Sequence, residues 1–196
     1  MTHTSAWISK GWQMVTANFW SFVLAALLYL LVMAVGSAAS WIIGGPALAA
    51  VYGVILYLLR TGRLDFDRLQ DGFQVFVPAM LVGIVAGIFT AVGFAFCIVP
   101  GIILSALYLF PLLLVLDRRM PFWEAMEESR KKVQQDLLGF LGFVLALFGI
   151  NVLGALVCGV GMLVSIPVTW CATAVAYQEL WPEPVTTILP PAQTET

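Results

Sequence analysis

Hydrophobic residues fill three long stretches of the chain, and charged residues are confined to the segments outside them. No Asp, Glu, Lys or Arg occurs in residues 11–59, 72–116 or 137–178, which are 49, 45 and 42 residues long. A helix crosses a membrane in about 20 apolar residues, so each stretch is long enough for two crossings joined by a tight turn. The pattern therefore predicts an all-α integral membrane protein whose six transmembrane helices form three hairpins.

The predicted helices of each hairpin are separated by helix-breaking residues, at 44–46, 100–101 and 159–161. A β-barrel is disfavoured because the apolar runs are continuous and lack both the alternation and the frequent turns of barrel strands. The six predicted spans are Asn18–Ser40, Pro46–Leu59, Phe73–Phe96, Gly101–Leu116, Leu137–Val157 and Met162–Gln178.

Each hairpin belongs to one of three similar units, at about residues 6–63, 64–119 and 120–181 of a single transmembrane domain. Each unit opens with an amphipathic, aromatic stretch, and Trp7, Phe66 and Phe122 are equivalent starting points, 59 and 56 residues apart. We interpret these stretches as short helices in the cytoplasmic membrane interface; the alternative is that they extend the membrane helices. Residues 182–196 form a Pro- and Thr-rich tail that we expect to be disordered.

Composition supports the membrane assignment. Hydrophobic residues make up 61% of the 196 residues, charged residues only 10%, and mean hydropathy is +0.98, which is too apolar for a soluble domain of this size. All nine Lys and Arg lie outside the hairpins, so the positive-inside rule places both termini and both charged loops in the cytoplasm. The first 40 residues also imitate a secretory signal peptide; its cleavage would leave the remaining topology unchanged.

The predicted spans contain no ionisable Asp, Glu, Lys, Arg or His, the residues that mark ion and proton pathways in membranes. This disfavours a proton-coupled transporter, a pump subunit and an intramembrane metalloprotease. His3 alone makes no metal site, and we expect no cofactor and no nucleic-acid partner. Cys97 and Cys158 fall near hairpin tips, where a disulfide between them is an open alternative, and Cys171 is interpreted as an apolar filler.

Small residues and one amide indicate where helices pack. Gly83 and Gly87 belong to a small-residue face on the third span, and Gly142 and Gly149 to a similar face on the fifth. Asn151 is the most polar residue deep in a span. We expect all five to pack helices within the chain; a dimer interface at the glycines and substrate binding by Asn151 are the alternatives.

A basic and aromatic cluster precedes the fifth span, and we predict that it lies against lipid head groups. Basic clusters attract anionic lipids by about 1 kcal/mol per residue; the alternative is that they reflect only the ordinary positive-inside bias. The predicted lipid-interface residues are Arg118, Arg119, Phe122, Trp123, Met126, Arg130, Lys131 and Lys132.

Residues 99–133 carry a pattern with a family resemblance. Val99-Pro100-Gly101-Ile102 is followed by Pro111, by Leu114-Val115-Leu116-Asp117 and by an amphipathic helix that contains Ser129. The pattern resembles the central motif of bacterial multi-pass membrane families related to the membrane domain of glycerophosphodiester phosphodiesterases and to YciC-like proteins. The resemblance implies a bacterial inner membrane, no assigned activity and no catalytic residues. It makes Pro100 and Gly101 a structural turn, and Asp117 a helix end at the cytoplasmic boundary.

These features lead us to expect a non-enzymatic inner-membrane protein that organises lipid or accompanies a membrane-protein partner, another copy of the chain included. One alternative is a carrier or channel for an apolar or lipid-like substrate, in a groove between units. Another is a lipid head-group enzyme at the cytoplasmic interface, which requires acids and bases such as Asp65, Asp67, Asp117 and Arg118 to converge in one pocket.

Overall fold

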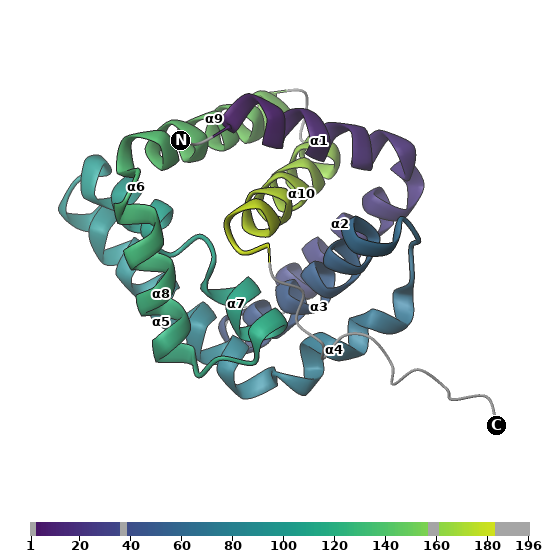
Figure 1. Cartoon of the computed structure of the whole chain (residues 1–196), viewed down its shortest axis with the longest axis horizontal. Coiled ribbons are helices and arrows are strands. Elements are labelled where there is room, and N and C mark those ends of the chain that lie inside the picture. Colours follow the sequence, from purple (N-terminus) through teal and green to yellow (C-terminus); the bar gives the residue numbers. More distant parts are fainter. Residues whose placement is uncertain (1–2, 36–38, 157–160, 183–196) are drawn as a thin grey trace.

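A computed structural model describes residues 3–35, 39–156 and 161–182, and every regular element in these ranges is helical (Figure 1). The predicted all-α class is therefore confirmed for the described residues. In chain order the helices are α1 (Thr4–Ala17), α2 (Phe19–Val35), α3 (Ala39–Thr61), the 3₁₀ helix η1 (Phe66–Arg68), α4 (Leu69–Gln74), α5 (Phe76–Phe96), α6 (Ile98–Leu107), α7 (Pro111–Arg118), α8 (Phe122–Gln134), α9 (Leu137–Leu156) and α10 (Met162–Leu180).

Four helical segments are long and apolar enough to cross a membrane: Ile43–Thr61 in α3, Phe76–Phe96 in α5, Ile98–Arg118 across α6 and α7, and Leu137–Leu156 in α9. A fifth arises if α1 and the first part of α2 count as one broken span, since the pair meets the same criterion with a bend of 99°. The fold is thus that of a helical membrane protein with four or five candidate spans among the described residues.

Helix α10 lies at the centre of the molecule, with the other helices around it (Figure 1). It packs against α1, α2, α3 and α9, and its residues from Val168 to Tyr177 are almost all buried. Thr169 and Thr173 donate hydrogen bonds to the carbonyls one turn earlier, at 3.0 and 2.8 Å. A central helix can carry such hydroxyls because the helix itself accepts their hydrogen bonds. Gln178 and Glu179 at its end lower the mean hydropathy of α10 most, and α10 is not among the four apolar candidates.

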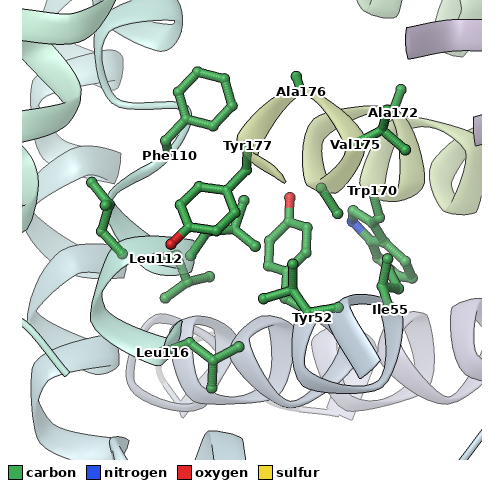
Figure 2. Packing of buried hydrophobic residues seen from close by; sticks show 14 of the residues in the cluster. Tyr52, Ile55, Phe110, Leu112, Leu116, Trp170, Ala172, Val175, Ala176 and Tyr177 are labelled. Atoms are coloured by element: carbon green, nitrogen blue, oxygen red, sulfur yellow. The ribbon is translucent and has the colours of Figure 1, made fainter. Parts of the chain in front are cut away.

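The largest buried side chains gather where α10, α3, α7 and α9 meet, and Figure 2 shows part of this core around Phe110, Tyr52 and Tyr177. Phe110 packs edge-on against Phe140 at 5.8 Å between ring centroids. Trp7 from α1 joins the same core through Phe143, at 5.1 Å. The core therefore ties the first helix of the chain to its last third.

Each amphipathic segment packs on the helix that precedes it in the chain, and α1 packs on the last helix, α10. Helix α1 packs on α10, η1 and α4 pack on α3, and α8 packs on α7 and α6. A small residue makes each contact. A Cβ on Gly11 would lie 2.8 Å from the Ala172 nitrogen, and one on Gly72 would lie 2.3 Å from the Ala50 nitrogen. On α8 the equivalent residue is Ser129, described below.

Two predicted turns are wrong. The Gly44-Gly45-Pro46 segment lies inside α3, and Gly45 serves helix packing there: a Cβ on Gly45 would lie 2.2 Å from the Ala79 carbonyl oxygen on α5. Pro100 and Gly101 lie in the first turn of α6, and the chain reverses at Cys97, whose backbone is extended. Gly101 instead packs against the Phe94 ring. In both cases a signal for chain reversal marks a close contact between two helices.

Candidate functional site

The most distinctive polar site joins the ends of three helices that finish at the same end of the molecule. Asp117, in the last turn of α7, is fully buried. Its Oδ1 accepts a hydrogen bond from Arg60 Nη1 at 2.7 Å, and its Oδ2 accepts one from Arg60 Nη2 at 2.8 Å. The Tyr177 hydroxyl on α10 also donates to Oδ2, at 2.9 Å. We call Arg60, Asp117 and Tyr177 the helix-end triad.

Hydrogen bonds within the triad engage both carboxylate oxygens of Asp117. A buried carboxylate is costly unless it is paired and hydrogen-bonded, and here both oxygens of Asp117 are engaged, in the planar two-point geometry that guanidinium favours. The Arg60 side chain keeps 19% of its surface exposed. Because three hydrogen bonds already occupy the carboxylate, the site can hold α3, α7 and α10 together. Asp117 is at a helix end, as expected, but the sequence reasoning missed its two partners.

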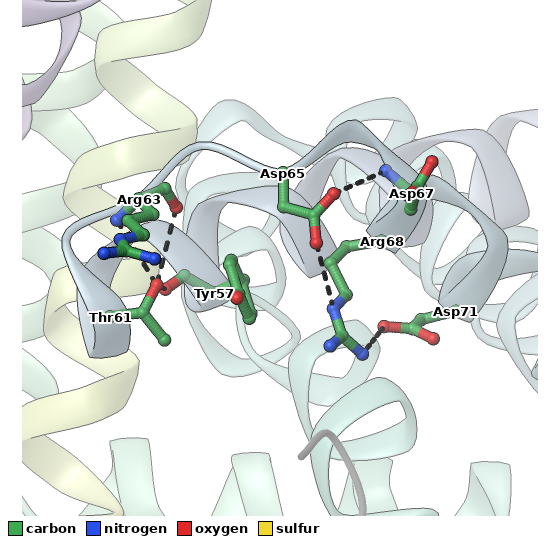
Figure 3. A network of polar contacts seen from close by, with 7 residues as sticks. All are labelled: Tyr57, Thr61, Arg63, Asp65, Asp67, Arg68 and Asp71. Carbon is green, nitrogen blue, oxygen red and sulfur yellow. Dashed lines mark hydrogen bonds and ion pairs between the residues drawn. The ribbon is translucent and has the colours of Figure 1, made fainter. Parts of the chain in front are cut away.

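Asp65 and Asp67 lie in a separate polar network that fixes η1 and α4 to α3 (Figure 3). The Asp65 carboxylate caps η1 by accepting a hydrogen bond from the Asp67 nitrogen at 3.0 Å. Arg68 lies between Asp65 and Asp71, at 3.7 and 3.8 Å, with its guanidinium 4.8 Å above the Tyr57 ring of α3. The acids named for a head-group enzyme therefore fall into two places, and they do not share one pocket with Asp117.

An apolar groove of about 560 Å³ lies between α2, α3 and the η1–α4 segment. We call it the lateral groove. Its walls are Phe22, Ala25 and Leu28 on α2, and Ala47, Val51 and Val54 on α3, among others. Phe66, Leu69 and Phe73 complete it from η1 and α4, and all three side chains are substantially exposed. The groove follows from the amphipathic pattern of this short segment, which turns its aromatic face toward α2 without filling the space.

The predicted lipid-interface residues on α8 lie in different environments. Trp123 is 60% exposed, whereas Met126 is buried in the protein core and Phe122 packs against that core. The buried face of α8 is held by Ser129, which donates to the Leu107 carbonyl at 2.7 Å and accepts from the Phe110 nitrogen at 3.4 Å. Most of the apolar face of α8 therefore contacts protein.

The basic residues of this cluster have partners within the chain. Arg130 contacts Glu127 through two nitrogens, at 2.6 and 2.8 Å, and Lys131 lies 3.6 Å from the same carboxylate. These cations hold the pKa of Glu127 at about 2, and the carboxylate in turn raises the pKa of Arg130. Lys132 lies 5.8 Å from the centre of the Trp181 ring. The positive charge of Arg130 and Lys131 is therefore partly balanced by Glu127 of the same helix.

The two arginines before α8 lie apart from this cluster. Arg118 is half-buried beside Tyr177, and its Nε is buried without a hydrogen-bond partner among the described residues. Arg119 has a left-handed backbone with φ of 52° and donates to the Gln74 side chain at 2.8 Å. Arg119 thereby connects the end of α7 to the end of α4.

The predicted helix-packing residues divide into two groups. Asn151 joins α9 to α10: its amide donates to Thr169 at 2.8 Å, and its oxygen accepts from Ser165 at 3.0 Å. Gly83 approaches Gly45 on α3, and Gly87 lines a cavity described below. A Cβ on Gly142 or Gly149 would meet no atom within 4 Å, so these two glycines face open space.

The described residues include two cysteines. Cys97 is exposed and Cys171 is buried, and both are free thiols. Cys158, the partner in the alternative disulfide with Cys97, and the tail beyond residue 182 lie outside the described residues. Within the described ranges, no three His, Cys, Asp or Glu side chains gather in a way that could hold a metal ion.

The chain resembles proteins of mycobacteria that have no assigned function. It is 26% identical over 144 residues to uncharacterised proteins of Mycobacterium bovis and of two Mycobacterium tuberculosis strains, covering 67% of this chain and 43% of each relative. The chain thus spans less than half the length of these curated relatives. No family model matches it, and no solved structure does. The comparisons show that the chain has bacterial relatives, and they assign it no activity.

Proposed function

We propose that this chain is a non-enzymatic bacterial inner-membrane protein that organises lipid, and that it does so by holding an acyl chain in the lateral groove. The observation that carries the proposal is the groove itself. It is almost wholly apolar, it lies beside the candidate span of α3, and its volume is in the range of small-molecule sites, about 300–1,000 Å³. In a bilayer, acyl chains are the apolar molecules present at the highest concentration.

The cyclic packing of the amphipathic helices supports a threefold repeat with six spans. The small residues Gly72 and Ser129 meet Ala50 and Leu107, and both members of the second pair follow the first by 57 residues. The triad residues Arg60, Asp117 and Tyr177 end the second helix of each unit, 57 and 60 residues apart. In this arrangement α2, α3, α5, α6–α7, α9 and α10 are the six spans, and α1, η1–α4 and α8 lie at the interface.

The distribution of basic residues supports the proposed orientation. Every Lys and Arg of the chain lies near the triad end of a helix or in a segment next to it, and by the positive-inside rule such an end is expected to face the cytoplasm. The bend of 99° between α1 and α2 suits a helix that lies along the interface before the chain enters the membrane. Exposed Trp12, Trp20 and Trp123 fall on this side, where indole rings favour the head-group layer.

The mouth of the groove carries both signs of charge: exposed Arg63 is followed by Asp65 and Asp67, which flank Phe66, so Arg63 is the cation there that can attract an anionic head group. Arg63 is exposed and directly precedes Leu64, which lines the groove. Basic residues at a membrane surface attract anionic lipids by about 1 kcal/mol each. The paired cations of α8 contribute less, because Glu127 already balances part of their charge.

Lipid retention tests this function. The protein is extracted into nanodiscs, released by gentle activation, and its bound lipids are counted by native mass spectrometry. Ala25 lines the groove, so Ala25→Phe fills it and should remove the retained lipid. The matched control is Ala155→Phe, which places the same side chain on the exposed face of α9. Equal retention by both variants, or a wild-type protein that carries only bulk lipid, would overturn the proposal.

Two other functions remain open to experiment. A carrier of lipid-like substrates is favoured by a second cavity, described below, that lies between α3, α5 and α6. A membrane-protein partner or a second copy of the chain would find an apolar face on α9, where Leu138, Phe148 and Leu153 are strongly exposed. Proteins that copurify with wild type and not with a Leu138 or Phe148 variant would favour the partner.

A further inference from the structure

A second cavity differs in chemistry from the lateral groove. It measures about 690 Å³ and lies between α3, α5 and α6, with Tyr29 of α2 on one wall. We call it the tyrosine cavity. The small-residue face of α5 explains why it is empty of side chains. Ala79 and Gly83, at one end of that face, pack closely against Gly45 of α3, and Gly83, Gly87 and Ala91 line the cavity.

Five residues with a side-chain hydroxyl group line the tyrosine cavity. They are Tyr29 of α2, Tyr52 of α3, Thr90 of α5, Ser105 of α6 and Tyr108, which directly follows α6. The rings of two of them are held in place: Tyr29 packs edge-on against Trp170 at 5.1 Å, and Tyr108 lies 5.6 Å from Phe89. The Tyr52 side chain is buried, with its hydroxyl toward α10 (Figure 2). Ser105 donates to the Ile102 carbonyl at 2.8 Å, which leaves its oxygen able to accept.

No lining residue of this cavity is ionisable at neutral pH, and the remaining lining is apolar, including Leu48, Val82 and Leu112. An ionised head group would have no opposite charge among the lining residues, which is a large cost in an apolar surrounding. The charges that act on Tyr108, those of Arg130 and Glu127, already pair with each other. A wholly apolar chain would leave the tyrosine and threonine hydroxyls without partners, which is also unfavourable. The lining therefore matches a ligand that is apolar along most of its length and carries neutral hydrogen-bonding oxygens.

We propose that the tyrosine cavity binds a neutral glycerolipid of the diacylglycerol type. Its ester carbonyls would accept hydrogen bonds from Tyr29 and Tyr108, its free hydroxyl would pair with Thr90 or Ser105, and its chains would lie against the apolar wall. The site is separate from the lateral groove, because the two share no lining residue other than Tyr29. It extends the proposed function from holding bulk phospholipid chains to selecting a lipid without a charged head group.

Photocrosslinking tests the proposal. A clickable diacylglycerol with a diazirine in its acyl chain is added to the full-length protein in phosphatidylcholine nanodiscs, and labelled peptides are identified by mass spectrometry. We expect labelling on α3, α5 and α6, competed by unlabelled diacylglycerol and not by phosphatidic acid. Ala86→Phe fills the cavity and should abolish this labelling, whereas Ala155→Phe should leave it unchanged.

Two further variants keep the result interpretable. Tyr29→Phe and Tyr108→Phe remove a hydroxyl without changing the volume, and each should weaken labelling about fivefold, the effect of one hydrogen bond. Ala25→Phe should spare it while removing lipid from the lateral groove, so the two proposals fail separately. Equal labelling by a phosphatidic acid probe, or undiminished labelling in both tyrosine variants, would overturn the proposal.

Discussion

Arg60 and Asp117 form a two-point ion pair between the last turns of two apolar helices, with N–O distances of 2.7 and 2.8 Å. They lie 57 residues apart, which is the length of one predicted unit. Tyr177, 60 residues further on, completes the arrangement from α10. Helices α3, α7 and α10 are thereby joined at one end, and α3 contributes a wall to both cavities.

Removal of the buried charge should destabilise the protein strongly. Asp117→Asn leaves the Arg60 guanidinium without its counter-charge, and breaking a buried ion pair in this way costs about 3–5 kcal/mol. Tyr177→Phe removes one hydrogen bond and should cost about 1 kcal/mol. Unfolding in a mixed-micelle denaturant series measures both effects. Asp67→Asn is the control, because Asp67 is exposed, and a loss as large as that of Asp117→Asn would contradict our account of the triad.

Glycines at the helix contacts should be far less tolerant than glycines that face open space. Gly72→Ala places a Cβ 2.3 Å from the Ala50 nitrogen, and relief of such a clash costs about 1–3 kcal/mol. Gly142→Ala meets no atom within 4 Å and replaces a glycine within a helix, so it should be neutral or stabilising by about 0.5–1 kcal/mol. Thermal midpoints in detergent compare the two; equal midpoints would show that α4 does not pack on α3 as described.

The ion pair between Glu127 and Arg130 on α8 should make the stability of the protein depend on pH in the acidic range. The pKa of Glu127 is lowered to about 2 from an ordinary value of 4.5, so the folded state favours the ionised form. The resulting stabilisation is fully present above pH 4.5 and is lost as pH falls toward 2. Glu127→Gln should flatten this part of the pH profile of the thermal midpoint. Glu124→Gln removes another carboxylate of α8 and should retain the full slope; matching profiles would refute the assignment.

Thiol labelling tests the orientation of the chain. Cys97 is exposed at the reversal between α5 and α6, on the side that we place outside the cytoplasm. In a Cys158→Ser background, a membrane-impermeant maleimide should label Cys97 in intact spheroplasts. A Cys97→Ser, Lys131→Cys variant in the same background should react only after the membrane is permeabilised. The reverse pattern would invert the topology.

The apolar stretches predicted the long helices well. Helices α9 and α10 begin at the predicted residues, Leu137 and Met162. The turns at 44–46 and 100–101 failed because glycine and proline mark both chain reversals and close helix contacts, and the choice depends on neighbours far away in the chain. Asp117 was expected at a helix end, but its pairing with Arg60 was missed because the two residues are far apart in the chain. Their spacing of 57 residues was the available signal, since it places both at equivalent positions of the predicted repeat.

The central claim is that the lateral groove holds a lipid acyl chain, and electron cryomicroscopy of the protein in nanodiscs of brominated-chain phospholipid tests it most directly. Bromine scatters strongly enough to mark a chain that occupies a fixed position. We predict bromine density between Ala25 of α2, Val51 of α3 and Phe73 of α4. Density restricted to the bulk bilayer, with the groove closed by Phe66 and Phe73 against α2, would contradict the claim.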